Sequence, residues 1–159
     1  MTEQTKAYFH HMYEVSYAFG KAKDEREKEK AALIAADNWD AVHDWYEREK
    51  QFGSPYTTGQ FKAYWAFDRS SEIESEEMLM TDSLWEREVK DFSDTLKAAG
   101  VTTFVLAHQS TGLMEDIHNL ETQGWRLVGT CKVTTTRRRW GDDETEVLLG
   151  LRFEIGEEA

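Results

Sequence analysis

Hydrophobic positions in the first half of the chain repeat at the spacing of α-helices. From residue 2 to about residue 30, apolar residues follow one another at steps of three or four, which places them on one helical stripe. A second helix is predicted after Asp37 or Asn38, because either side chain can cap a helix N terminus. The first stripe consists of Tyr8, Met12, Val15 and Phe19, and the face of the second helix consists of Trp39, Val42, Trp45 and Tyr46.

Two further helices are predicted before residue 101. One begins near Thr58, and an acidic connection over residues 70–77 follows it. The other has clearer boundaries, because Ser83 and Glu86 have the spacing of a capping box and Gly100 stands where a glycine ends many helices. The residues expected to point inward are Phe61, Tyr64, Trp65 and Phe67 in the first of these helices, and Trp85, Val89, Phe92 and Leu96 in the second.

After Gly100 the pattern changes to that of β-strands. Residues 102–108 are β-branched or apolar in their middle, which predicts a strand that is buried on at least one face. A helix follows, capped by Ser110 or Thr111 and closed by Gly124. Two more strands alternate apolar and polar residues, over 125–133 and 146–155. The helix that follows the first strand is expected to bury Leu113, Met114, Ile117 and Leu120.

The last two strands are predicted to pair as a hairpin. If the odd-numbered apolar residues of both strands face one core, an unbulged two-residue turn is excluded. A three-residue loop, Trp140 to Asp142, is preferred because the next larger choice would set Lys132 opposite Arg152. The last strand also carries Leu148 and Gly150 on its other face, which indicates a central position. The predicted spatial order is therefore middle strand, last strand, first strand.

These elements predict an α+β fold in one domain that covers residues 1–159. Helices make up residues 1–70, and residues 83–156 form an α-β-α-β-β part with a three-stranded antiparallel sheet. The exposed face of such a sheet needs a cover, and the aromatic helices of the N-terminal part are the available material.

Composition narrows the class of protein. The 159 residues include six Trp, six Tyr and eight Phe, whereas disordered acidic chains are poor in aromatic residues. The single cysteine, Cys131, excludes an internal disulfide and a thiolate zinc site, and its place in the alternation indicates packing. No basic segment precedes an apolar run at the N terminus, and no run is long enough for a membrane span, so a cytoplasmic protein is expected.

Charge is distributed unevenly along the chain. The 31 acids and 19 bases give a net charge of −12, yet residues 122–141 contain no acid. The hairpin tip carries Arg137, Arg138, Arg139 and Trp140, a set that can bind phosphates bidentately and stack on a base. Acids at 142–146 lie across the hairpin and favour a compensated, protein-facing surface instead, because nucleic-acid binding requires uncompensated positive charge.

Two other surfaces offer alternative roles. The acidic remainder of the chain can imitate nucleic acid and occupy a basic groove of another protein, although acidic residues also serve solubility. Most aromatic residues fall between Tyr8 and Phe67, which is more than the cover of one small sheet requires. Core packing is the favoured interpretation of these residues, and a homodimer contact is the next one.

Motifs that fix a chemistry are missing from the sequence. It contains no nucleophile elbow, phosphate-binding loop or dinucleotide fingerprint. Residues 115–118 have the Glu-x-x-His spacing of di-iron bundles, but no second such motif exists, so neither a metal nor a cofactor is expected. The turn after His108 precedes a helix N terminus, where Ser110, Thr111 and Gly112 can hold an anion. Capping explains these residues more simply.

The sequence therefore favours a small acidic, non-enzymatic binding protein of the kind found in bacteria and their mobile elements. We expect it to occlude or bridge a macromolecular partner, with a protein favoured over nucleic acid. Contact is expected through Arg137 to Trp140 and adjoining acidic or aromatic helical surfaces. The alternatives are nucleic-acid binding through the same tip, acidic mimicry, and an enzyme site at the turn 108–112, which a turn packed shut without a cavity would exclude.

Overall fold

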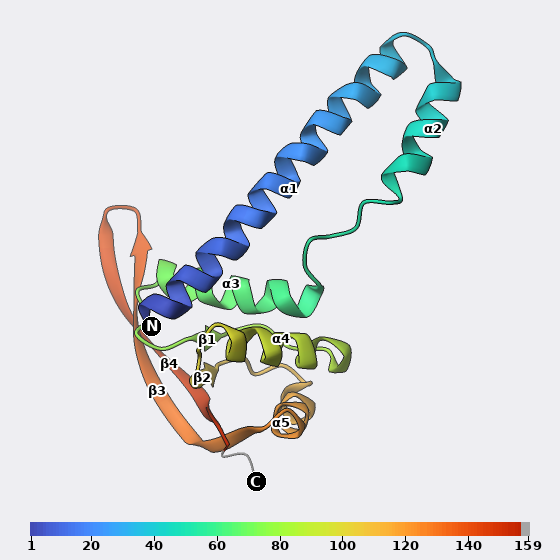
Figure 1. Ribbon diagram of the computed structural model, residues 1–159. Helices are drawn as coiled ribbons and strands as arrows, with labels where there is room; N and C mark the ends of the chain where they lie inside the picture. Colours follow the sequence, from blue (N-terminus) through green and yellow to red (C-terminus); the bar gives the residue numbers. More distant parts are fainter. Residues whose placement is uncertain (157–159) are drawn as a thin grey trace. The chain divides into compact units, whose positions relative to one another are not determined.

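In the part of the chain that the structure describes, the protein has an α+β fold with five helices and a four-stranded sheet (Figure 1). The computed structural model describes residues 1–156, apart from the side chains of residues 137–139. The chain divides into two compact units. One, the helical unit, is His10–Tyr56, and the other, the sheet unit, combines Met1–Phe9 with Thr57–Ala159.

The helical unit consists of most of α1 (Glu3–Ala35) and of α2 (Trp39–Glu49). As predicted, Asn38 caps α2, and its side chain accepts a hydrogen bond from the amide of Ala41 at 3.3 Å. The indole of Trp45 is buried and donates to the carbonyl of Arg26 at 2.9 Å. Arg26 also pairs with Glu49 at 2.8 Å. A hydrogen bond from a side chain to the backbone and an ion pair thus join the two helices.

The buried face of α2 is narrower than the sequence predicts. Val42 and Trp45 are buried, whereas Trp39 and Tyr46 are exposed over half or more of their surface. Trp39 stands at the first residue of the helix, where its indole donates to Asp37 at 3.1 Å.

In the sheet unit, α3 (Thr58–Glu72) and α4 (Glu86–Ala98) approach each other closely. A Cβ atom at Gly59 would lie 2.4 Å from the carbonyl oxygen of Glu88, so only glycine fits there. The start of α3 near Thr58 is confirmed, and Thr57 closes a capping box with Gln60. The capping box predicted from Ser83 to Glu86 is wrong. Helix α4 begins without a side-chain cap, and Trp85 at its N terminus is exposed.

The sheet is mixed and four-stranded, with the order β1-β2-β4-β3. The predicted order of β3, β4 and β2 is correct, but the prediction of a three-stranded antiparallel sheet is wrong. A two-residue strand, β1, pairs in parallel with β2 just after the expected connection 70–77, where no strand was predicted because two residues are too few to show a period. The strands are β1 (Leu79–Met80), β2 (Thr103–Leu106), β3 (Trp125–Arg139) and β4 (Asp142–Ile155).

The β3–β4 hairpin has a two-residue turn, not the predicted three-residue loop. Arg139 pairs with Asp142, which leaves Trp140 and Gly141 as the turn. Gly141 has a φ of 90°, a conformation that glycine adopts without strain. A β-bulge between Leu127 and Gly129 shifts the register by one residue. The bulge makes the short turn compatible with an inward-facing Leu127.

Apolar residues cover both faces of the sheet. On one face, Phe104 packs against Trp125 and Phe153, with ring centroids 4.9 and 5.4 Å apart, and against Phe92 of α4. Helix α5 (Leu113–Thr122) contributes the fully buried Leu120, whereas Met114, predicted to point inward, is 82% exposed. The other face carries a smaller cluster of Ile73, Leu79, Val105 and Val133, with Ala107, Cys131 and Leu148 packed against it.

Candidate functional site

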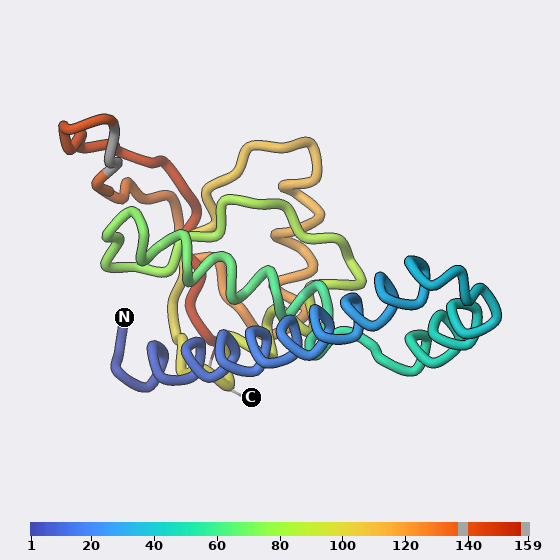
Figure 2. Tube along the Cα trace, turned by 90° about the horizontal axis from the view of Figure 1, so that it is seen from above, coloured from blue at the N-terminus to red at the C-terminus, as the bar shows by residue number. Residues whose placement is uncertain are grey.

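The β3–β4 hairpin continues beyond β2 as a two-stranded ribbon, Cys131–Gly150 (Figures 1 and 2). Pairing between β4 and β2 begins at Leu151, so the β4 residues before Leu151 pair with β3 alone. One face of the ribbon is anchored: Val133 is buried in the smaller cluster, and the amide of Thr136 donates to the carbonyl of Ile73 at 2.9 Å. The ribbon is therefore held to the body at one face.

The opposite face of the ribbon is apolar and exposed. Val147 and Leu149 are 57% and 55% exposed, although both are large aliphatic residues in a strand. Their cross-strand partners are Thr134 and Lys132, respectively, so all four side chains share this face. At the turn, Trp140 is fully exposed. The outer face thus offers aliphatic side chains and the ammonium of Lys132, and the turn of the same ribbon offers an indole.

The tip of the ribbon places bases opposite acids. The backbone register sets Arg137 against Glu144, Arg138 against Asp143 and Arg139 against Asp142. The side chains of Arg137, Arg138 and Arg139 lie outside the described part of the structure. The register alone puts three formal positive charges directly across from three formal negative charges. The tip therefore carries no net formal charge.

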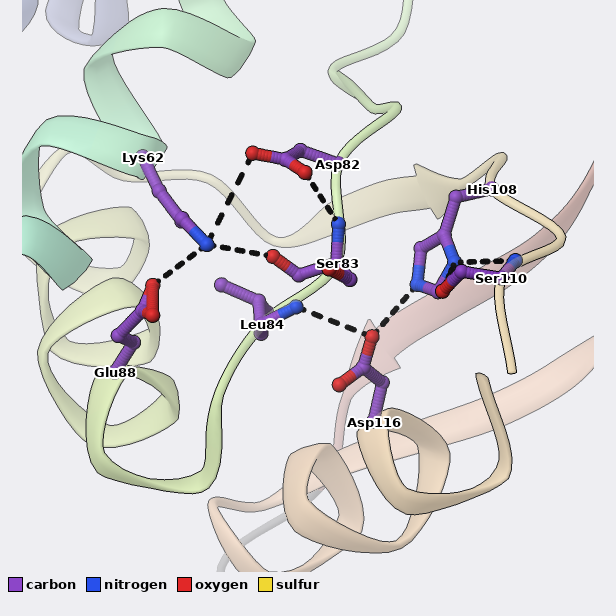
Figure 3. A network of polar contacts seen from close by, with 8 residues as sticks. All are labelled: Lys62, Asp82, Ser83, Leu84, Glu88, His108, Ser110 and Asp116. Atoms are coloured by element: carbon purple, nitrogen blue, oxygen red, sulfur yellow. Dashed lines mark hydrogen bonds and ion pairs between the residues drawn. The ribbon is translucent and has the colours of Figure 1, made fainter. Parts of the chain in front are cut away.

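A buried ion pair lies between α3 and α4 (Figure 3). The ammonium of Lys62 is 2.7 Å from Glu88 Oε2, and the two groups form an ion pair whose geometry is not that of a hydrogen bond. The ammonium donates a hydrogen bond to the carbonyl of Ser83 at 2.8 Å. Only 10% of the Lys62 side chain and 4% of the Glu88 side chain are exposed. Asp82 lies 3.9 Å from the same ammonium. Sequence periodicity does not predict this pair, because its members lie on different helices.

Next to this pair, a histidine joins three segments of the chain (Figure 3). His108 Nε2 is 2.6 Å from Asp116 Oδ2 in α5, and both side chains are almost completely buried. Asp116 also accepts the amide of Leu84, at 3.2 Å, from the segment before α4. On the other side of the ring, Nδ1 lies 2.9 Å from the hydroxyl of Ser110. Asp116 therefore ties the end of β2, the start of α5 and the loop before α4 together.

The residues predicted as an anion site have other roles or surroundings. Ser110 and Thr111 do not cap α5, whose N-cap is Gly112, and no side chain makes the capping hydrogen bond. The cap prediction is wrong because the hydroxyl of Ser110 turns back to His108. A cleft of about 460 Å³ lies beside α5 and is lined by Glu86, Met114, Glu115, His118 and Asn119. Residues 108–112 are not among these lining residues.

A protein-family model matches the part of the chain that contains the ribbon and both buried polar clusters. A family model described as Domain of unknown function (DUF7698) matches residues 62–155, which is more than half of the chain. The chain belongs to the DUF7698 family. The matched region begins at Lys62 and contains the whole ribbon and the His108–Asp116 pair. Comparison with curated proteins and with solved structures finds no significant match.

Within the DUF7698 region, His118 lies on α5 and lines the cleft, but the described residues contain no group of three or more metal-ligating side chains. In the helical unit, His10 pairs with Glu14 at 2.8 Å across one turn of α1, and both side chains are exposed. Over residues 1–156, no helix combines the length and the apolar character needed to cross a membrane.

Cys131, at the base of the ribbon in the DUF7698 region, should react slowly with thiol reagents. Burial raises the pKa of its thiol, the Arg152 guanidinium lowers that pKa, and Glu77 raises it again. The thiolate is the reactive form, so at pH 8 we expect slower modification by an aromatic disulfide reagent than in urea-unfolded protein, with the difference closing at higher pH. Equal rates in folded and unfolded protein at pH 8 would contradict this expectation.

Proposed function

We propose that this DUF7698 protein binds a macromolecular partner through the outer face and turn of the ribbon, and that the partner is a protein. The observation that carries the proposal is the exposure of Val147, Leu149 and Trp140 together on a two-stranded element. Val147 and Leu149 share the outer face, and Trp140 lies at the turn of the same ribbon. Exposed large apolar residues that share a surface are typical of interaction sites, and an exposed tryptophan is a frequent energetic anchor of protein interfaces.

The charge pattern supports a protein partner over nucleic acid. Binding to a phosphate backbone gains affinity from the release of counterions, which requires positive charge that the protein does not itself compensate. Here each arginine of the tip faces a carboxylate residue in the register, and the protein as a whole carries a charge of −12. Lys132 remains on the outer face as a point where an acidic group of the partner can add specificity.

Ribbon variants should lose partner proteins in a capture experiment with the full chain as bait. We expect Trp140→Ala combined with Leu149→Asp to lower the recovery of specific proteins from host extract at least tenfold, because an anchor residue typically accounts for 2 kcal/mol or more, roughly a 30-fold change in affinity. Quantitative mass spectrometry of the captured proteins measures the loss.

The matched control is Trp85→Ala, which removes another exposed indole of the sheet unit at a site outside the ribbon. It should retain the proteins that the ribbon variant loses. Equal recovery with the wild type and the ribbon variant would refute the proposal.

Replacing Arg137, Arg138 and Arg139 together by alanine tests the tip: unchanged recovery would exclude the arginines from the interface. Capture of nucleic acid that falls steeply with salt would instead support the nucleic-acid alternative.

A further inference from the structure

A serine, a histidine and an aspartate form a continuous hydrogen-bonded chain at the start of α5 (Figure 3). The hydroxyl of Ser110 is 2.9 Å from Nδ1 of His108, and Nε2 of the same ring is 2.6 Å from Asp116. Ser110 is exposed, whereas the histidine and aspartate side chains are only 6% and 2% exposed. Ser110 can thus be reached from solvent, whereas the histidine and the aspartate beside it are shielded from water.

The backbone fixes the proton arrangement of the histidine. The amide of Ser110 donates to Nδ1 at 3.2 Å, so Nδ1 is an acceptor in the neutral ring. The ring hydrogen is then on Nε2 and is donated to Asp116. The single lone pair of Nδ1 is then shared between the Ser110 amide and the nearer Ser110 hydroxyl. Transfer of the hydroxyl proton to Nδ1, the direction that a general base requires, breaks the longer contact with the amide.

We propose that Ser110 is a nucleophile, with His108 as its general base and Asp116 as the positioning residue, and that it accepts acyl groups from accessible esters. The roles are those of a Ser-His-Asp triad, in which the carboxylate holds the imidazole in its tautomer and stabilises the imidazolium. Here Nδ1 contacts the serine and Nε2 contacts the aspartate, which is the reverse of the usual triad. Each of the three residues keeps its role. This activity is independent of partner binding through the ribbon.

The step is an acyl transfer. Oγ of Ser110 forms a bond to the ester carbonyl carbon while the hydroxyl proton moves to Nδ1 of His108. The tetrahedral intermediate collapses, the bond to the ester alcohol breaks, and the departing oxygen takes the proton from Nδ1. The products are acyl-Ser110 and an alcohol, and water releases the acid by the same sequence in reverse.

A serine-directed probe tests the proposal on the full chain. An alkyl phosphonofluoridate forms a stable adduct when an activated serine displaces fluoride, and peptide mass spectrometry identifies the labelled residue. Ser71 is the internal control, because it is also exposed and has no contact with a histidine among the described residues. We expect Ser110 to be labelled roughly 10²- to 10⁴-fold faster than Ser71, the usual contribution of a positioned general base.

Variants separate the roles. Ser110→Ala should abolish the label while the protein stays folded, since the residue is exposed. Asp116→Asn keeps an oxygen for the Leu84 amide, so we expect a lower maximal labelling rate with an unchanged half-saturating probe concentration. Release of 4-nitrophenol from 4-nitrophenyl acetate, with acetyl found on Ser110, would extend the result to esters. Equal labelling of Ser110 and Ser71 in the wild-type protein would overturn the proposal and assign the contacts to the turn alone.

Discussion

Replacing Lys62 by alanine is expected to lower the free energy of unfolding by about 3–5 kcal/mol, the range found when one partner of a buried ion pair is removed. Glu88 is almost fully buried and has its cationic partner at 2.7 Å. Without the ammonium, its carboxylate would remain desolvated between α3 and α4 without a charged partner. Urea unfolding followed by tryptophan fluorescence measures the change in the midpoint at an unchanged slope.

The double variant Lys62→Met with Glu88→Leu distinguishes the charge effect from loss of packing. Apolar replacements of similar volume for a buried ion pair are often neutral or stabilising, because no charge is then left in the interior. We therefore expect the double variant to recover most of the stability that Lys62→Ala loses. A loss below 1 kcal/mol for Lys62→Ala would show that water reaches Glu88 and that the pair is not effectively buried.

The strand pattern predicted the pairing of the sheet but misplaced the core along the ribbon. In the predicted sheet, Cys131 and Val133 face the same core as Trp125 and Leu127. The bulge before Gly129 turns the following residues over, so that Val133 joins the smaller cluster on the opposite face. A bulge inserts one residue into a strand without altering its apolar composition, so the pattern does not reveal it. Leu148 and Gly150, on the other face of the last strand, were the signal that both faces of the sheet are covered.

Helix positions were predicted well and the edges of their buried faces less well. Val89, Phe92 and Leu96 of α4 are buried as the stripe predicts, whereas Trp85 is 64% exposed. Trp65 of α3 is likewise exposed over half of its surface. An apolar stripe covers a wide arc of a helix, and the neighbouring element decides which part of that arc is buried. That neighbour is a property of the fold and is not visible in one segment.

The polar clusters were the least accessible to sequence reasoning. The turn after His108 was recognised as a possible site, and its start at the end of β2 is correct. The role of Ser110 was misassigned because a serine before a helix is usually a cap. Its actual partner follows from the loop conformation, and the link from His108 to Asp116 and Leu84 needs three segments to meet. Periodicity describes one element at a time and contains no such contact.

Replacing Trp125 by alanine should lower the free energy of unfolding by about 3–5 kcal/mol, as much as Lys62→Ala. This is the usual cost of removing a buried aromatic side chain. Trp125 is 1% exposed, packs edge-on against Phe104, and donates its indole hydrogen to Ser93 at 2.8 Å. Truncation therefore removes a large apolar contact and leaves the hydroxyl of Ser93, which is completely buried, without its donor. Urea unfolding followed by far-ultraviolet circular dichroism measures the effect without relying on tryptophan emission.

Trp125→Phe and Ser93→Ala divide this effect into packing and hydrogen bonding. The phenylalanine variant keeps an aromatic ring beside Phe104 and should lose less stability than the alanine variant. Adding Ser93→Ala to Trp125→Phe removes the unpaired hydroxyl, so the double variant should be at least as stable as Trp125→Phe alone. The exposed Trp85 provides the control, because its replacement by alanine should change stability by less than about 0.5 kcal/mol. If Trp125→Ala and Trp85→Ala had equal effects, Trp125 could not be at the centre of the aromatic core.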